Sequence, residues 1–296
     1  MKQTRLFRSL WAVGLLLTLT PGCKKEADNA TPTPAAMPTP TVEKACQLNR
    51  LDRSSGEYEL YDSDANGRTT KYSLFHADEK GKIPTTPVVG TLTYNAQGLA
   101  ERVTVAADNY HEQFSYTNGA LSKIEIFEQN KKMYQYDVTT NANKHITAMK
   151  GISFTKDPNS VYSWEYSTTF TLDAQGRYTS LTAKGADGDY YREIRTGFEP
   201  TMKSFFDTWK DNGLPVDVTN PSAEYGLYMP TAPGLRLKTE YFWGYDANDN
   251  YVGLKKDREF TFSPKANSRN YVTERTSTNV LSKTTSTTKF QYSNCN

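Results

Sequence analysis

An alternating pattern interrupted by a tight turn constrains this chain more than any other feature of its sequence. The clearest copy lies at 161–184, where VYSWEYSTTFTL and RYTSLTAK flank the turn Asp173-Ala-Gln-Gly176. Large residues occupy alternate positions of the first arm, and Ser, Thr and Glu lie between them. Successive side chains of a strand leave opposite faces of a sheet, so the segment is predicted to be a β-hairpin with one aromatic face. Gly176 suits the turn because glycine adopts positive φ without steric cost.

Similar turns recur along the chain behind a Tyr or a Leu. They include Tyr61-Asp-Ser-Asp-Ala-Asn-Gly67, Tyr94-Asn-Ala-Gln-Gly98 and Tyr116-Thr-Asn-Gly119, with looser copies after Tyr136 and Tyr245. Further strands are expected at Lys238–Tyr245, Tyr251–Phe262, Tyr271–Leu281 and Thr285–Tyr292. The sequence therefore predicts an all-β fold, an antiparallel meander of about a dozen strands curled into an open or closed barrel-like sheet.

One segment departs from the β pattern. Within Glu199–Asn212, four large residues recur at helical spacing: Met202, Phe205, Phe206 and Trp209. We expect an amphipathic helix there, followed by an irregular proline-rich connection, so that helix and loop together occupy about 199–235. The helix would either form a lid over a pocket or simply cover the core, as aromatic stripes at this spacing usually do.

The N-terminus has the features of an export signal. Positive residues precede the short apolar run Leu10–Leu19, which ends near Cys23. We expect a signal peptide at 1–22, a Pro/Thr-rich tether at 23–45 and the β domain at 46–296. The segment LTLTPGC resembles a bacterial lipobox, although Thr20 and Pro21 depart from its usual residues. This resemblance implies that Cys23 is lipidated and holds the protein on a membrane; an ordinary secretory signal is the alternative.

Two further resemblances concern the class of protein. The charged stretch KKEAD directly after Cys23 resembles the export signal of Bacteroidetes-type surface lipoproteins, and the Tyr-Asp turns resemble the YD repeats of bacterial surface and toxin-shell proteins. Together they imply a lipoprotein of the bacterial outer membrane, either periplasmic or exposed at the surface. They imply no particular ligand.

The charge of the chain excludes one class of partner. Its net charge is +2, and without Lys2, Arg5 and Arg8 of the leader it holds 32 basic and 33 acidic residues. A nearly neutral chain without a basic block offers no electrostatic surface for nucleic acid. We therefore expect the membrane, reached through the lipid, and a glycan or envelope protein as partners.

Two cysteines bracket the β domain, Cys46 and Cys295. An exported protein meets an oxidising compartment, so a disulfide between the first and last strands is favoured over two free thiols. Such a bond would suit a closed barrel or a strongly curled sheet.

A possible calcium loop begins in the first turn. Asp62, Asp64 and Asn66 supply oxygen ligands at alternate positions before Gly67, but Ser73 stands where the closing acid of the motif belongs. Asp and Asn also stabilise tight turns by bonding their own backbone, which explains the same residues without a metal. We expect no cofactor.

Catalytic motifs are missing from the sequence. Its three histidines lie far apart, and it contains no nucleophile elbow, zincin, P-loop or dinucleotide fingerprint. Glu165 and Glu193 would be the pair for a glycosidase-like cleft, but both fall on the polar sides of their strands and are expected in solvent.

The aromatic residues are the remaining candidates for a binding site. Tyr162, Trp164 and Tyr166 share one strand face, and Tyr241, Trp243 and Tyr245 share another. Such faces either form the core or stay partly exposed to stack on sugars or acyl chains; the core interpretation is favoured because other large apolar residues are few. Tyr162, Trp164, Tyr166 and Trp243 are therefore weak ligand-binding candidates.

The sequence supports two hypotheses for function. The first is a non-enzymatic, lipid-anchored envelope or surface protein with a binding or structural role. The second is a glycan- or lipid-handling enzyme with a cleft under the inserted helix.

Overall fold

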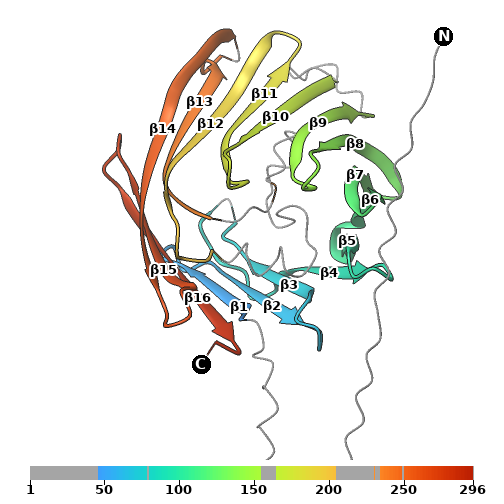
Figure 1. Ribbon diagram of the computed structural model, residues 1–296, viewed down its shortest axis with the longest axis vertical. Coiled ribbons are helices and arrows are strands. Elements are labelled where there is room, and N and C mark those ends of the chain that lie inside the picture. Colours follow the sequence, from blue (N-terminus) through green and yellow to red (C-terminus); the bar gives the residue numbers. More distant parts are fainter. Residues whose placement is uncertain are drawn as a thin grey trace, which may run out of the picture. The chain divides into compact units, whose positions relative to one another are not determined.

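Sixteen antiparallel strands form one closed barrel in the part of the chain that the computed structural model describes. The described residues are 46–78, 80–154, 165–204, 230, 234–248 and 250–295. Each strand pairs with its neighbours in sequence, and the first strand closes the barrel by pairing with the last (Figure 1). The strands are β1 (Gln47–Arg53), β2 (Tyr58–Ser63), β3 (Thr69–Phe75), β4 (Val88–Tyr94), β5 (Ala100–Val105), β6 (Tyr110–Thr117), β7 (Ala120–Glu128), β8 (Lys131–Thr140), β9 (Ile146–Ser153), β10 (Glu165–Leu172), β11 (Tyr178–Gly185), β12 (Gly188–Glu199), β13 (Leu235–Tyr245), β14 (Tyr251–Ala266), β15 (Val272–Asn279) and β16 (Thr285–Ser293).

The all-β antiparallel meander predicted from the sequence is confirmed, but the predicted number of strands is too low. The hairpin read at 161–184 corresponds to β10 and β11, whose arms pair from Ser167↔Lys184 to Leu172↔Tyr178. Strands were undercounted because some turns carry no glycine signal. Between β7 and β8, Gln129 and Asn130 both adopt positive φ, 48° and 62°, in a two-residue turn.

The predicted inserted helix is not observed where its first turn was placed. Glu199 is the last residue of β12, and Lys203 forms an isolated bridge with Tyr271. The backbone N–H of Lys203 donates to the Asn270 carbonyl at 2.7 Å, and its carbonyl accepts from Val272 at 3.0 Å, so this backbone is committed to pairing. Residues 205–212 of the predicted helix lie outside the described residues. The described part of the chain contains one short 3-10 helix, η1 (Ala106–Asp108).

One turn conformation recurs between many of the strands. An Asp or Asn at the first position accepts hydrogen bonds from the backbone N–H groups two and four residues later. Among the described residues this turn occurs seven times, starting at Asp64, Asp78, Asn95, Asn141, Asp173, Asp246 and Asn267. In six of the copies the fourth residue is described and has positive φ, for example 77° at Gly176. This is the type I turn followed by a left-handed residue that suits three-residue hairpin loops.

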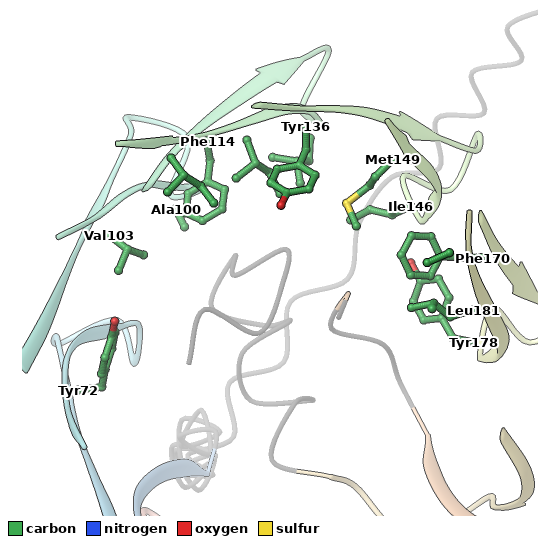
Figure 2. Packing of buried hydrophobic residues seen from close by; sticks show 14 of the residues in the cluster. Tyr72, Ala100, Val103, Phe114, Tyr136, Ile146, Met149, Phe170, Tyr178 and Leu181 are labelled. Atoms are coloured by element: carbon green, nitrogen blue, oxygen red, sulfur yellow. The ribbon is translucent and has the colours of Figure 1, made fainter. Parts of the chain in front are cut away.

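The core lines the inside of the barrel. Phe114, Tyr136, Met149 and Phe170 point to the inner side of the curved sheet in Figure 2. One inner row runs by cross-strand pairing from Phe114 through Ile124, Tyr136 and Gly151 to Tyr166. Because these residues belong to five consecutive strands, a single face of the meander is buried all along this arc.

Two tyrosines of the core lie over glycines on the neighbouring strand. Tyr72 is paired with Gly90, and Tyr166 is paired with Gly151. A methyl group at Gly151 would stand 2.2 Å from a ring carbon of Tyr166, and one at Gly90 would stand 2.0 Å from the ring of Tyr72. Glycine is needed here because the ring lies where a β-carbon would be.

The outer face is charged and polar where the barrel closes. Lys265 of β14 is opposite Glu274 of β15, which is opposite Lys289 of β16, which in turn is opposite Asp52 of β1. Their charges alternate in sign across four strands, and the Lys265 ammonium lies 2.6 Å from the Glu274 carboxylate. The alternate side chains of these strands, among them Phe290, point inward.

Candidate functional site

The inner wall formed by β12 and β13 carries the densest group of aromatic side chains. Tyr191 is directly opposite Trp243, and their ring centroids are 6.2 Å apart. Trp243 also contacts Tyr190 at 6.0 Å and Tyr245 at 6.2 Å in tilted or edge-on geometry. Aromatic rings in these arrangements attract each other beyond the area that they bury. The half-buried Trp243 is thus held by its neighbours as part of the wall.

Beside this wall, Glu193 of β12 is completely buried, with 0% of its surface exposed. Its Oε1 accepts a hydrogen bond from Arg195 Nε at 2.6 Å and lies 3.9 Å from Arg236 Nε. Burial alone would raise the pKa of Glu193, but the charges of Arg195 and Arg236 outweigh burial, so its pKa lies below the ordinary value. Glu193 lies two positions after Tyr191 on the same strand, so its side chain also points inward. The expectation that Glu193 lies in solvent is therefore wrong.

A second buried carboxylate belongs to Glu59 of β2. It is paired with Arg53 and accepts a hydrogen bond from Tyr61, and it lies 3.1 Å from His76 Nε2. Burial opposes its ionisation, but the hydrogen bond to His76 and the charge of Arg53 are stronger, and its pKa is lowered. Glu59 is therefore an anion inside the barrel.

The buried acids share a sequence pattern with a neighbouring tyrosine. In Glu59-Leu-Tyr61, Tyr110-His-Glu112 and Tyr191-Arg-Glu193, a Tyr and a Glu lie two positions apart on one strand face, and each Tyr hydroxyl bonds its Glu. Sequence reasoning missed them because a charged residue in a strand was assigned to the solvent face. An acidic residue two positions from an inward-facing aromatic residue on the same strand is the signal that would have predicted these buried acids.

Arg275 of β15 completes the inner charge cluster. Its guanidinium carbon lies 5.1 Å from the ring centroid of Phe262 and 6.0 Å from that of Phe290. Burial, together with the nearby charges of Arg236 and Arg53, lowers the pKa of Arg275 to about 10. A cation on an aromatic face is favourable, but it is not neutralised.

The aromatic candidates from the sequence are distributed between the core and the undescribed part of the chain. Tyr166 is buried, and its hydroxyl lies 2.8 Å from that of Tyr136. Trp243 and its neighbours pack against the same core, so the prediction that these faces form the core is confirmed for the described residues. Tyr162 and Trp164 lie outside the described residues, as does Cys23.

The residues of the possible calcium loop have other partners. Asp64 binds the backbone of Asn66 and Arg68 and forms an ion pair with the Arg68 side chain at 2.7 Å, while Asp62 lies 3.5 Å from Lys71. Within the described ranges no group of three or more acidic, His or Cys residues is positioned to hold a metal. The arrangement is that of the recurring turn.

The two cysteines of the β domain lie together at the seam of the barrel. Cys46 and Cys295 form a disulfide, with their Cα atoms 4.8 Å apart. Both are buried beside Tyr271, and Tyr292 packs against them. The bond joins the chain just before β1 to the chain just after β16.

Comparison with solved structures supports the barrel fold. A porin-like protein from Bacteroides uniformis superposes with a TM-score of 0.51 and 12% identity, over 83% of this chain and 96% of that chain. This chain shares the barrel fold of that protein. A porin-like protein from Bacteroides vulgatus gives a TM-score of 0.46 and 9% identity, over 83% and 98% of the two chains. The Tc holotoxin pore of Photorhabdus luminescens gives a TM-score of 0.29 and 11% identity, over 78% and 14%.

Sequence comparisons add no family. No protein-family model matches the chain, and a search of curated proteins gives no match. The resemblances to YD repeats and to surface lipoproteins therefore stay predictions. In the part of the chain that the structure describes, no helix has the length and apolar character needed to cross a membrane.

Proposed function

We propose that this chain is a non-enzymatic, lipid-anchored envelope or surface protein whose barrel stands in water and serves a binding or structural role. The observation that carries this proposal is the outward row of alternating charges Lys265, Glu274, Lys289 and Asp52 at the seam. A barrel that spans a membrane presents an apolar band about 25 Å tall to the lipid and a polar lumen. Here the outer face carries charges at the seam, and the inner face is lined by aromatic and aliphatic residues around a group of buried ion pairs.

Other strands support the same orientation. On β10 the outward residues are Ser167, Thr169 and Thr171, while Tyr166 and Phe170 are buried. On β13 and β14 a cluster of paired lysines and glutamates is partly exposed: Lys238, Glu240, Lys256 and Glu259. Each Lys at the middle of a bilayer would cost about 2–4 kcal/mol. This distribution of outward polar residues supports a barrel whose outer face lies in water.

Attachment to the membrane is assigned in this proposal to Cys23. A lipid on Cys23 and the tether at 23–45 would hold the barrel near the bilayer without inserting it. Labelling with radioactive palmitate tests the anchor directly. Wild-type protein should take up the label and Cys23→Ser should not; label retained by the variant would remove the anchor from the proposal.

The orientation of the barrel needs a separate test. The full chain carrying Cys23→Ser, with a generic cleavable secretion signal in place of residues 1–22, should be recovered in the aqueous fraction without detergent. It should also add no conductance to planar lipid bilayers. A variant that needs detergent, or that opens channels, would contradict a water-exposed barrel even if the palmitate result holds.

The binding role is best tested with glycans. A glycan array probed with the same secreted variant should give signals if the barrel binds sugars. Absence of any signal, together with silence in lipid overlays, would leave a structural role.

The enzymatic alternative is a glycan- or lipid-handling enzyme with a cleft under the inserted helix. A glycosidase needs one carboxyl with a raised pKa to act as general acid. Despite burial, the pKa values of Glu59 and Glu193 are lowered instead, by His76 and Arg53 beside Glu59 and by Arg195 and Arg236 beside Glu193. These two carboxylates therefore lend the alternative no support.

A further inference from the structure

A small cavity lies between β13, β15 and β16 on the inner side of the barrel seam. Its volume is about 20 Å³, and it is lined by two arginines, Arg236 and Arg275, together with Ser204, Leu235, Val272 and Phe290. The Nε atoms of both arginines are buried and have no hydrogen-bond partner among the described residues. Two guanidinium groups thus border one small space, each with an Nε donor that no described residue accepts.

Among the described residues, guanidiniums outnumber carboxylates around this cavity. Four guanidiniums lie in the cluster, those of Arg53, Arg195, Arg236 and Arg275. Two carboxylates of the described residues oppose them: Glu59, bound to Arg53, and Glu193, bound to Arg195 and near Arg236. No carboxylate among the described residues pairs with Arg275, whose immediate contacts are the rings of Phe262 and Phe290.

An uncompensated charge in such a place is costly. Buried charges in proteins are normally paired, because an unpaired one loses its hydration without gaining a partner. The positive charges of Arg236 and Arg53 also act on Arg275, and its pKa of about 10 still leaves it protonated at neutral pH. An anion between the two arginines would reduce this imbalance and give Arg275 a partner of opposite charge.

The size and walls of the cavity restrict the kind of anion. A space of about 10–15 Å³ holds one water molecule, so about 20 Å³ accommodates one monatomic ion and is small for a tetrahedral oxyanion. Leu235, Val272 and Phe290 form an apolar side of the cavity, which suits a weakly hydrated monovalent ion. We propose that this cavity binds one small monovalent anion of the size of chloride, with the guanidiniums of Arg275 and Arg236 as its donors. The site is independent of the role proposed above.

Thermal unfolding in two salts tests the site. The full chain is measured in sodium chloride and in sodium gluconate at equal, high ionic strength, so that general screening is the same. Chloride should raise the midpoint of the wild type saturably, by roughly 5 °C at full occupancy. In Arg275→Gln the chloride concentration needed for half of the effect should increase at least tenfold.

The matched control is Arg258→Gln, which removes a guanidinium that lies 5.6 Å from the Tyr241 ring but has an exposed side chain. It should keep the chloride response of the wild type. Arg275→Lys, which keeps the charge, should show a weaker response and serves if the Gln variant does not fold. An equal response in wild type and both Arg275 variants would overturn the site.

A direct measurement needs no variant. Crystals grown in bromide should show an anomalous peak between the Arg236 and Arg275 guanidiniums, and a crystal without this peak would contradict the proposal.

The stability of Arg275→Gln in gluconate distinguishes an anion site from simple packing of Arg275. If Arg275 is held only by Phe262 and Phe290, Arg275→Gln should be less stable in both salts; an anion site predicts that its deficit appears in chloride and shrinks or reverses in gluconate.

Discussion

Glu193 is held as an anion inside the barrel by Arg195 and Arg236. Replacing it with Gln keeps its volume but leaves both guanidiniums without their carboxylate, next to a third at Arg275. Breaking a buried ion pair from one side costs about 3–5 kcal/mol. We expect Glu193→Gln to lower the free energy of unfolding in urea by that amount. Glu240→Gln, on the partly exposed Lys238–Lys256 cluster, is the matched control and should unfold within error of the wild type.

The same carboxylates determine how stability responds to acid. The pKa values of Glu59 and Glu193 are lowered in the folded state from the ordinary value of 4.5. The unfolded chain therefore takes up protons first as the pH falls, and the stability that these groups contribute is present above about pH 4.5 and lost as the pH falls through their folded pKa values. Urea midpoints measured from pH 7 to pH 3 should decline below pH 4.5, and less steeply in Glu193→Gln. A decline of equal slope in both proteins would show that Glu193 does not carry the effect.

At the scale of residues, alternation in the sequence was enough to assign the aromatic core but not the buried acids. Tyr166 and Phe170 point inward because large apolar residues at every second position of a strand are buried together on the inner face. Glu193 occupies an inward position of its strand in the same way, but a charged residue was expected to point into solvent. Only the folded barrel brings Arg236, on the next strand, within reach of Glu193, and no local pattern contains that information.

At the scale of elements, the recurring turn is the unit that the chain repeats. In the turn after β10, Asp173 Oδ1 accepts from the backbone N–H groups of Gln175 and Arg177 at 3.0 Å, and Oδ2 accepts from Arg177 Nε at 2.7 Å. Asp173→Ala loses all three bonds and should cost about 1–2 kcal/mol in urea unfolding. Asp173→Asn keeps the acceptor for the two N–H groups and should cost less than half as much. An equal loss in both variants would assign the stabilisation to the ion pair with Arg177 instead of the backbone bonds.

The copies that end in Gly67, Gly98 and Gly176 were the most predictable elements, because an Asp or Asn followed three residues later by Gly is a local chemical requirement. The half-motif at Asp62–Asn66 has the same turn geometry. The first turn of the predicted helix at Glu199 failed for the opposite reason. Its periodicity was local, but the backbone of Lys203 is bound by Asn270 and Val272, which are remote in sequence.

At the scale of the whole molecule, closure distinguishes this fold from an open meander. The repeat pattern gave strands and turns but left open whether the sheet closes, since closure depends on the pairing of β1 with β16. That pairing runs from Gln47↔Ser293 to Arg53↔Thr288. The two cysteines were the one sequence signal that joined the ends.

The seam is therefore where the stability of the barrel should respond most to a covalent change. The disulfide between Cys46 and Cys295 spans 249 residues, and in the chain-entropy model a loop of this length stabilises the fold by roughly 5 kcal/mol. The double variant Cys46→Ser/Cys295→Ser should lose up to this amount in urea unfolding. It should also exchange the amide hydrogens of β1 and β16 faster, because those strands then lose the covalent link between their ends. Amides of β6 and β7, on distant strands of the barrel, provide the internal control. Uniformly faster exchange in all four strands would show that the bond stabilises the barrel only as a whole, and unchanged exchange in β1 and β16 would show that pairing alone closes it.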